Sequence, residues 1–344
     1  MAYDLRPFLT AVEAIIASHR LAPGQYRRWN GPDPRAAVGG GIKHTPRDLG
    51  PNEYGIADAA NLLYTLGRFP QESSDRDAWI TALRGRQHPT TGLFEEATHH
   101  PIHTTAHCIA ALELFDAVPA HPVRALLEHA TPAGIVRFLE ALDWRENPWN
   151  HSHRGAGLYV ALALTGAPDR ATAEAYFGWL WNQADPATGL WRVNCVAPLP
   201  HSGGTTRFPH LAGTFHYLFN LEYAHQPLRY PAALVDTCLQ MVEADPFALG
   251  QSVGFAEIDW VYCLNRGLRQ SGHRFGEAQT ALRTFAEKYI PFLTSLDPAT
   301  HDGLNDLHCL FGAVCCLAEL QAALPGELIT DRPLKLVLDR RPFI

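Results

Sequence analysis

Several long stretches of the chain carry apolar residues on nearly every side of a helical turn. Examples are IADAANLLYTLGRF (56–69), GAGLYVALALTG (155–166) and FAEIDWVYCLNRGL (255–268). A helix that is apolar all round is typical of one buried between other elements. Stretches 123–130 and 274–289 instead keep their charges on one side, as helices facing solvent do. Alternating Val/Ile/Thr runs, the usual strand signal, do not occur. The pattern predicts an all-α fold with inner and outer helices.

Three turn segments repeat along the chain in the same order and with similar flanks. They are HPTTGLF (88–94), DPATGLW (185–191) and DPATHDGL (297–304), roughly 100 residues apart. Asp-Pro followed by Gly favours a turn, because proline fixes φ and glycine permits positive φ. Each turn follows an aromatic-rich helix and precedes a helix with a similar end, as in AALELF (110–115) and FNLEYA (219–224). We therefore expect three repeats, each made of two helical hairpins.

Six hairpins predict a closed (α/α)6 toroid, or barrel, with six inner helices inside six outer ones. This arrangement explains how the whole chain, 1–344, buries its core as a single domain. Two segments lie outside the repeats. The Gly/Pro-rich stretch 22–55 is long for a loop and is interpreted as a lid, with disorder as the alternative. The closing stretch 331–344 either lies across the toroid as an extended tail or contacts another subunit.

Composition narrows the classes of partner. The formal net charge is −7 and no basic run occurs, which argues against nucleic acid. No uncharged apolar stretch reaches the length of about 18 residues that a membrane span needs, and the start does not read as a signal peptide. Seven cysteines without a CxxC pair fit reduced thiols. We expect a cytoplasmic protein with a small-molecule substrate, and a homo-oligomer stays open.

Histidine is the unusual residue type, with 18 copies. Each predicted inner helix begins with polar or ionisable residues, and in a toroid these starts meet at one end of a central cavity. Helix N-termini also offer free N–H groups and a partial positive charge. We therefore expect the functional site there. Its candidate residues are Tyr54, Asp58, His103, His107, His153, Arg154, His210, His216, Glu257, Asp259, Trp260, Asp306 and His308.

The candidates divide by the chemistry of their side chains. Asp259 is expected to be the principal catalytic carboxylate, because an unpaired carboxylate among apolar residues is costly unless it has a function. A structural salt bridge is its alternative role. His103, His107 and His308 are the catalytic candidates for proton transfer, since histidine titrates near neutral pH. Arg154 would orient an anionic or hydroxyl group, and the remaining candidates would bind substrate as walls of the pocket.

Two stretches resemble known families. RQHPTTGLFEEATHHPIHTTAHCIAALELF (86–115) resembles the Q-x-x-x-G-aromatic repeat of the squalene cyclase and protein prenyltransferase superfamily. DLHCLFGAVCCLAEL (306–320) is similar to the zinc-histidine helix of protein prenyltransferase β subunits. Turns like DPATGLW also occur in six-hairpin sugar enzymes such as unsaturated glucuronyl hydrolases and N-acylglucosamine epimerases. The resemblance implies an α/α toroid and does not select one reaction.

The resemblance to prenyltransferases also implies a zinc site made of an Asp, a Cys two residues later and a distant His. Asp259 and His308 match the outer two positions, but Val261 stands where the cysteine belongs. We therefore expect no metal and no other cofactor. A zinc ion, if one binds, would be held by Asp259, His308 and His103. The Asp-x-Asp-Asp and Asp-Asp-x-x-Asp motifs of terpene cyclases are also missing from the sequence.

A pocket rich in imidazoles and carboxylates suits general acid–base chemistry on a hydroxylated substrate. We therefore expect an enzyme that acts on a carbohydrate or sugar-derived polar substrate by hydrolysis, elimination or epimerisation. Two alternatives stay open. One is an isoprenoid enzyme, meaning a terpenoid cyclase, a prenyltransferase-like enzyme or a dehydratase-isomerase, with an aromatic-lined cavity. The other is a non-catalytic binding module.

Overall fold

The computed structural model describes residues 2–33, 46–197, 207–244 and 249–344, which are predominantly helical, so the all-α prediction is confirmed. In these ranges the strands form two short pairs. They are β1 (Tyr3–Asp4) parallel to β4 (Leu328–Ile329), and β2 (Arg20–Ala22) antiparallel to β3 (Gln25–Tyr26). No helix within the described ranges has the length and apolar character needed to cross a bilayer.

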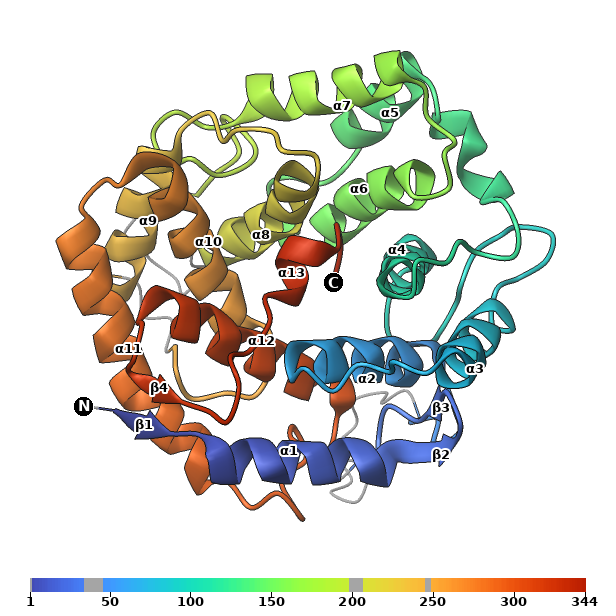
Figure 1. Cartoon of the computed structure of the whole chain (residues 1–344). Helices are drawn as coiled ribbons and strands as arrows, with labels where there is room; N and C mark the ends of the chain where they lie inside the picture. Colours follow the sequence, from blue (N-terminus) through green and yellow to red (C-terminus); the bar gives the residue numbers. More distant parts are fainter. Residues whose placement is uncertain (1, 34–45, 198–206, 245–248) are drawn as a thin grey trace.

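Six helices form the centre of the fold, and we call them the central helices (Figure 1). They are α2 (Glu53–Thr65), α4 (Pro101–Leu114), α6 (Pro148–Ala163), α8 (Phe208–Tyr223), α10 (Ala256–Ser271) and α12 (Leu307–Ala323). Each packs against the next in chain order, and α12 packs back against α2, so the succession of contacts closes on itself. Most of their residues are buried, as the apolar sequence pattern predicts.

A second set of helices lies outside the central ones (Figure 1). It comprises α1 (Arg6–His19), α3 (Ser73–Arg84), α5 (Pro132–Glu140), α7 (Arg170–Gln183), α9 (Pro231–Ala244) and α11 (Phe275–Ser295). The 3-10 helix η2 (Arg124–His129) and the short α13 (Val337–Arg340) complete the helical elements. These outer helices bury one side only; in α3, for example, the buried residues are Trp79 and Leu83.

The three repeated turns share one backbone hydrogen bond. In each, the amide of the fifth residue donates to the carbonyl of the first, over 2.8 Å in 88–92, 2.8 Å in 185–189 and 2.9 Å in 297–301. Gly92 and Gly189 occupy the fifth position with φ of 77° and 72°, a conformation that strains other residues. A side chain on Gly92 would also lie 2.0 Å from the carbonyl oxygen of Pro122. The turns 88–92 and 185–189 therefore require glycine for both conformation and space, whereas His301 occupies the same position in the third turn.

The starts of the central helices are held by the caps that their sequences supply. The side chain of Asn52 accepts a hydrogen bond from the amide of Gly55 (2.7 Å) and so caps α2. Asp306 caps α12 by accepting from the amide of His308 (3.0 Å). Pro101 occupies the first turn of α4, where its fixed φ suits a helix and its missing N–H is not needed. Such caps set where each helix begins, and hence where its first side chains point.

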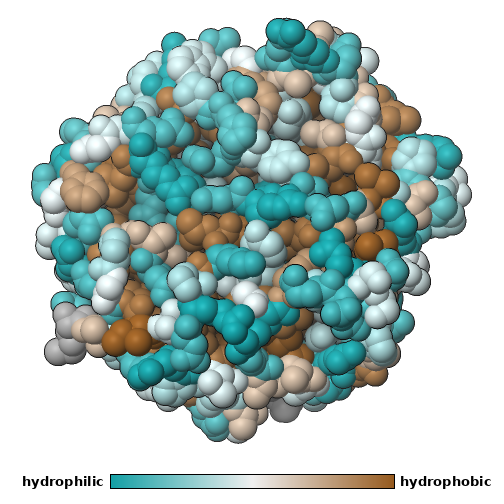
Figure 2. All heavy atoms as spheres, viewed as in Figure 1, coloured by the Kyte–Doolittle hydropathy of each residue, from teal (hydrophilic) through white to brown (hydrophobic). Residues whose placement is uncertain are grey.

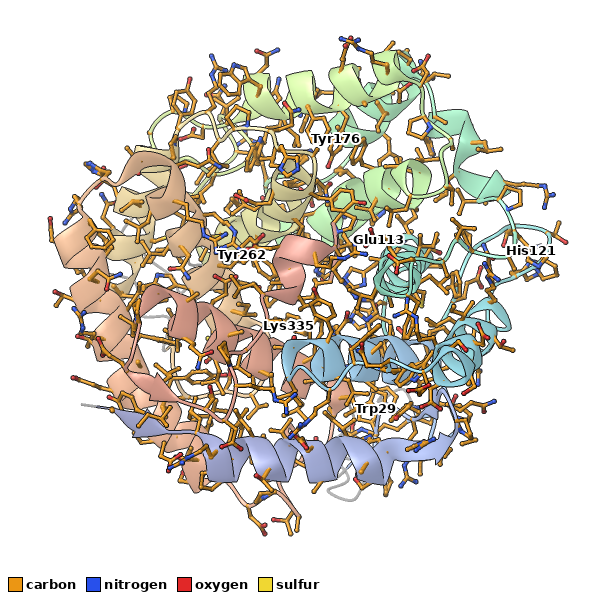
Figure 3. All side chains as sticks on the ribbon, viewed as in Figure 1. Trp29, Glu113, His121, Tyr176, Tyr262 and Lys335 are labelled. Atoms are coloured by element: carbon orange, nitrogen blue, oxygen red, sulfur yellow. The ribbon has the colours of Figure 1, made fainter. Side chains whose placement is uncertain are left out.

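A buried arginine ties three elements together on the side away from these helix starts. Arg266 of α10 donates to Glu319 of α12 over 2.8 and 3.1 Å, and it also pairs with Asp339 of α13. Its guanidinium carbon lies 3.8 Å from the ring centre of Tyr262, which is labelled in Figure 3. Because Arg266 is fully buried, these partners compensate the charge it brings into the interior.

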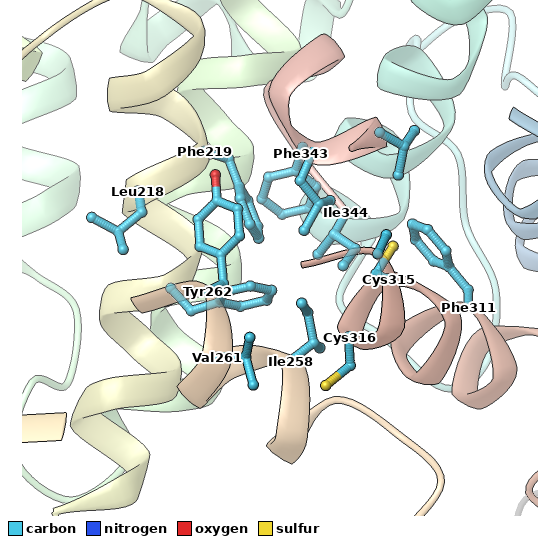
Figure 4. Packing of buried hydrophobic residues seen from close by; sticks show 14 of the residues in the cluster. Leu218, Phe219, Ile258, Val261, Tyr262, Phe311, Cys315, Cys316, Phe343 and Ile344 are labelled. Carbon is cyan, nitrogen blue, oxygen red and sulfur yellow. The ribbon is translucent and has the colours of Figure 1, made fainter. Parts of the chain in front are cut away.

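The last residues of the chain enter the space between the central helices (Figure 1). The short helix α13 packs against α8 and α2. Beyond it, Arg341, Phe343 and Ile344 are at most 1% exposed. Figure 4 shows Phe343 and Ile344 among the buried side chains of the central helices, between Phe219 and Phe311. The segment 341–344 is therefore part of the core of this chain, which neither interpretation made from the sequence had anticipated.

We predict that His19, a buried residue at the end of α1, makes folding stability depend on pH. Its Nδ1 donates to the carbonyl of Arg27 (3.0 Å), and burial lowers the pKa of His19 from 6.5 to about 4. Between those two pH values the unfolded chain takes up a proton that the folded chain does not, so stability falls as the pH drops. Between pH 7 and 4, wild type should lose up to about 3 kcal/mol more than His19→Gln.

Urea denaturation of both proteins at several pH values measures this difference. The Gln variant keeps a polar side chain that cannot titrate, so it is the control for wild type. The stability of each protein at pH 7 is the reference for its own change at lower pH. Parallel stability curves for the two proteins between pH 7 and 4 would contradict the prediction.

Candidate active site

One enclosed cavity lies where the starts of the central helices meet. Its volume is about 130 Å³. It is lined by His99, His103, Trp149, His153, His216, Phe255, Asp259, His308 and Ile344. Five of the central helices reach it or its immediate surroundings through their first turns, and His216 reaches it from the third turn of α8. The structure thus brings five sequence-predicted residues, Asp259, His103, His153, His216 and His308, onto a single cavity.

A tyrosine from α2 orients the histidines of α4. The hydroxyl of Tyr54 lies 2.5 Å from Nδ1 of His103. The Tyr54 ring stacks on His99 and His107, with ring centres 4.4 and 4.8 Å apart. Burial, reinforced by the charge of Glu96, raises the pKa of Tyr54, so the phenol keeps its proton at neutral pH. Tyr54 therefore fixes the imidazoles of α4 without itself lining the cavity.

An aspartate from α2 binds two of the predicted histidines. Nδ1 of His308 lies 3.2 Å from Oδ2 of Asp58, and Nε2 of His107 lies 2.9 Å from Oδ1. Burial acts to raise the pKa of Asp58, but attraction to His308 and His107 and their hydrogen bonds outweigh it and hold that pKa well below the ordinary value. Since a carboxylate only accepts hydrogen bonds, His308 carries its hydrogen on Nδ1 and keeps a lone pair on Nε2.

The charge of this aspartate is balanced through His107 by an arginine from the last residues of the chain. Nη2 of Arg341 lies 3.0 Å from Nδ1 of His107. A guanidinium only donates, so Nδ1 of His107 accepts and its hydrogen sits on Nε2, facing Asp58. Arg341 also donates to Asn61 of α2. Burial lowers the pKa of Arg341 to about 10, so it stays charged at neutral pH.

Asp259 is a buried carboxyl group without a partner. It is 0% exposed, and neither of its oxygens has a hydrogen-bond partner among the described residues. Burial, with the nearby charge of Glu257, raises the pKa of Asp259 well above its ordinary value. Burial thus favours the protonated form of Asp259, which lines the cavity and in that form can donate a hydrogen bond. The structural salt bridge, its alternative role, is not formed with any described residue.

The imidazoles around the cavity are uncharged at neutral pH. Burial lowers the pKa of His216 to about 3 and that of His99 to about 4. Burial also lowers the pKa of His103 and His153 well below 6.5, and the neighbouring imidazoles add to the effect because protonating one ring disfavours protonating the next. Ring centres of His103 and His153 lie 4.5 Å apart, and those of His153 and His216 lie 4.3 Å apart. Uncharged imidazoles can act as bases or as metal ligands.

Three predicted substrate-binding residues have structural partners away from the cavity. Glu257 accepts hydrogen bonds from Ser252 and from the amide of Gly250, and so holds the loop before α10. Trp260 donates to the carbonyl of Cys238 in α9 (3.0 Å) and packs toward the outer layer. His210 lies 3.4 Å from the carbonyl of Trp191. Each side chain stands on a different face of its helix from the cavity residues, which the sequence alone could not establish.

Two further candidates are also engaged elsewhere. Arg154 places its guanidinium carbon 5.8 Å from the ring centre of Phe138, on the side of α5. Asp306 pairs with Arg28 over 2.8 and 3.0 Å and accepts from the indole of Trp29 (2.8 Å), which Figure 3 labels. Asp306 therefore anchors the start of the expected lid 22–55 to α12. Residues 34–45 of that lid lie outside the described residues.

Sequence reasoning placed three contributors elsewhere or passed over them. His99 is not among the candidates named from the sequence, yet it lines the cavity, and its Nδ1 lies 3.0 Å from Glu96. The spacing of His99, His103 and His107, one helical turn apart each time, is a signal that could have found it. Arg341 and Ile344 give no such signal, because nothing local to the tail indicates that it ends inside the core.

Two groups of three side chains bring possible metal ligands together. One is His103, His153 and His216; the other is Asp58, His107 and His308. In each group, one ligand atom per residue lies within 4.8 Å of the other two. The set inferred from the zinc resemblance, Asp259, His308 and His103, shares the same cavity but does not form one of these groups.

No protein-family model, curated protein or solved structure matches this chain. The likeness to squalene cyclases, prenyltransferases and six-hairpin sugar enzymes therefore rests on the quoted sequence motifs.

The position of the tail predicts that Phe343 contributes to stability as a core residue. Its ring centre lies 5.0 Å from that of His103 and 6.4 Å from that of Phe219. Phe343→Ala should therefore lower the free energy of unfolding by about 3–5 kcal/mol. Phe275→Ala is the matched control, because Phe275 is 58% exposed and should cost far less. Chemical denaturation measures both variants, and equal losses would contradict the placement of the tail.

Proposed function

We propose that this chain is an (α/α)6 toroid enzyme that acts on a small carbohydrate or sugar-derived molecule by general acid–base catalysis. The closed succession of contacts among the central helices, with further helices outside them, supports the toroid. The observation that carries the enzymatic proposal is that a base and an acid face the same cavity. His308 is the base and Asp259 is the acid.

The base is His308, oriented by Asp58. Its Nδ1–H is held by the carboxylate (3.2 Å), so the lone pair of Nε2 is free to take a proton from substrate. When it does, Asp58 stabilises the imidazolium that forms. Burial lowers the pKa of His308 while Asp58 opposes that effect, so the ring is uncharged at neutral pH and ready to accept.

The acid is Asp259, whose raised pKa keeps a proton on a carboxyl group that otherwise would be ionised at neutral pH. Paired titratable groups whose surroundings push their pKa values in opposite directions are a recurring arrangement for acid–base catalysis. Asp259 can donate its hydrogen to a substrate carbonyl or to a leaving oxygen. His308 and Asp259 come from α12 and α10, which pack directly against each other.

The number of carboxyl groups favours some reactions over others. Glycoside hydrolysis ordinarily uses two carboxyl groups that flank the scissile bond. Among the described residues that line the cavity, Asp259 has the one carboxyl side chain. One base and one acid instead suit removal of a proton next to a carbonyl, with a hydrogen bond to the carbonyl oxygen. Elimination or epimerisation is therefore favoured over hydrolysis.

The volume and the lining of the cavity limit the size and the kind of substrate. Its volume, about 130 Å³, is below the range of roughly 300–1,000 Å³ typical of pockets for drug-sized ligands, so only a small molecule or one end of a larger one fits. This disfavours a long isoprenoid chain. Trp149 lines the wall and offers an aromatic face to a sugar ring. The clustered pKa shifts disfavour a binding module, and the face seen in Figure 2 has hydrophobic areas broken up by hydrophilic ones.

The test is turnover of a panel of aldoses, ketoses, uronic acids and prenyl diphosphates in D2O, followed by NMR. Wild type should incorporate solvent deuterium next to a sugar carbonyl or eliminate water from a sugar acid. Asp259→Asn and His308→Gln should each lower that rate about 10²–10⁴-fold.

His210→Gln is the matched control, because His210 is buried but lies outside the cavity, and its rate should stay near wild type. Turnover of a prenyl diphosphate alone, or unchanged sugar turnover in Asp259→Asn and His308→Gln, would show the proposal to be wrong.

A further inference from the structure

We propose that His103, His153 and His216 bind a divalent transition-metal ion, with Zn²⁺ as the best match. These three side chains come from three successive central helices, α4, α6 and α8. One nitrogen of each ring lies within 4.8 Å of the other two. Around a tetrahedral Zn²⁺ with bonds of about 2.0–2.1 Å, ligand nitrogens stand about 3.4 Å apart. Small side-chain rotations would bring the three ring nitrogens to that spacing.

Two of the three rings, those of His103 and His216, are oriented in the way that metal-binding histidines require. Such histidines normally donate one ring N–H to a fixed oxygen and bind the metal with the other nitrogen. Nδ1 of His216 donates to the carbonyl of Ala212 (2.8 Å), which leaves the lone pair on Nε2. Nδ1 of His103 lies 2.5 Å from the phenolic oxygen of Tyr54, which can accept its hydrogen in the same manner.

Asp259 provides the second, independent observation. This carboxyl group lines the same cavity, is 0% exposed, and has no hydrogen-bond partner on either oxygen among the described residues. A buried carboxyl group left without partners is costly, and a cation in the cavity would stabilise its ionised form. Asp259 would therefore be a carboxylate when the ion is bound, whereas burial favours its protonated form in the metal-free chain. A set of three imidazoles with one carboxylate nearby suits zinc and similar transition metals.

The other group of possible ligands is already committed to hydrogen bonds within the protein. Asp58 is bonded to His308, and Nε2 of His107 faces Asp58 while its Nδ1 accepts from Arg341. A metal ion there would have to displace these contacts. In the group of His103, His153 and His216, the described hydrogen bonds of His103 and His216 use Nδ1 and leave Nε2 available. This difference favours His103, His153 and His216 over Asp58, His107 and His308 as the metal site.

The proposed site differs from the zinc set that the prenyltransferase resemblance implies, which would use Asp259 and His308 as primary ligands. The site also goes beyond acid–base catalysis by His308 and Asp259, because its three ligands have no role in that proposal. Metal binding can therefore be measured without any substrate.

The experiment titrates ZnCl₂ into the full-length chain after treatment with EDTA and dialysis, with calorimetry and elemental analysis as readouts. One Zn²⁺ should bind per chain. His153→Gln and His216→Gln should each weaken binding at least about 100-fold, and Tyr54→Phe, which removes the partner of His103, about 10–100-fold. His210→Gln, on the same helix as His216 but bonded elsewhere, should bind as wild type does.

Anomalous diffraction from crystals of the wild-type chain soaked in ZnCl₂ gives a readout that needs no variant. The zinc peak should lie between the three imidazoles. Less than a tenth of an equivalent of zinc, a peak at Asp58, His107 and His308, or loss of binding in His308→Gln but not in His216→Gln would overturn the assignment. Since no substrate is used, failure here leaves the acid–base proposal standing, and absence of turnover leaves the metal site standing.

Discussion

The interior of this protein depends on keeping a group of imidazoles uncharged. His99, His103, His153, His216 and His308 line one cavity, and three of them, His103, His216 and His308, are at most 7% exposed. Protonating any of them would place a charge in a poorly solvated space beside other rings that can also gain protons. Desolvation therefore sets the state of the whole group, and the uncharged rings can stack on one another and on Tyr54.

The negative charge of Asp58 is shared among several partners. Asp58 contacts the imidazoles of His107 and His308. His107 also accepts a hydrogen bond from Arg341, so its neutral ring lies between the negative charge of Asp58 and the positive charge of Arg341. Arg341 is in turn held by Asn61 from the same helix as Asp58. Asp259 receives no comparable compensation from the protein and keeps its proton instead. Asp58 and Asp259 thus differ in charge because their neighbours differ.

Sequence patterns predicted the helical class and the helix starts well, because both follow from local signals. Apolar residues on all sides identified the buried helices, and the three repeated turns have one backbone hydrogen bond in common. The direction in which a side chain leaves its helix is set by tertiary packing, which explains why His153 and His216 reach the cavity while Arg154 and His210 do not. The tail was unpredictable for another reason: Arg341 acquires its role only through residues hundreds of positions away.

Those distant contacts carry a consequence for how the chain folds. Arg28 meets Asp306 across 278 positions, and Arg341 meets Asn61 across 280. Contacts between residues so far apart in sequence form late in folding. Closing the long loop between them costs entropy, and this cost is compensated only when the contact has formed. Until that closure, the imidazoles remain hydrated and gain protons as ordinary histidines do. The final assembly of the interior is therefore coupled to the release of protons into solvent.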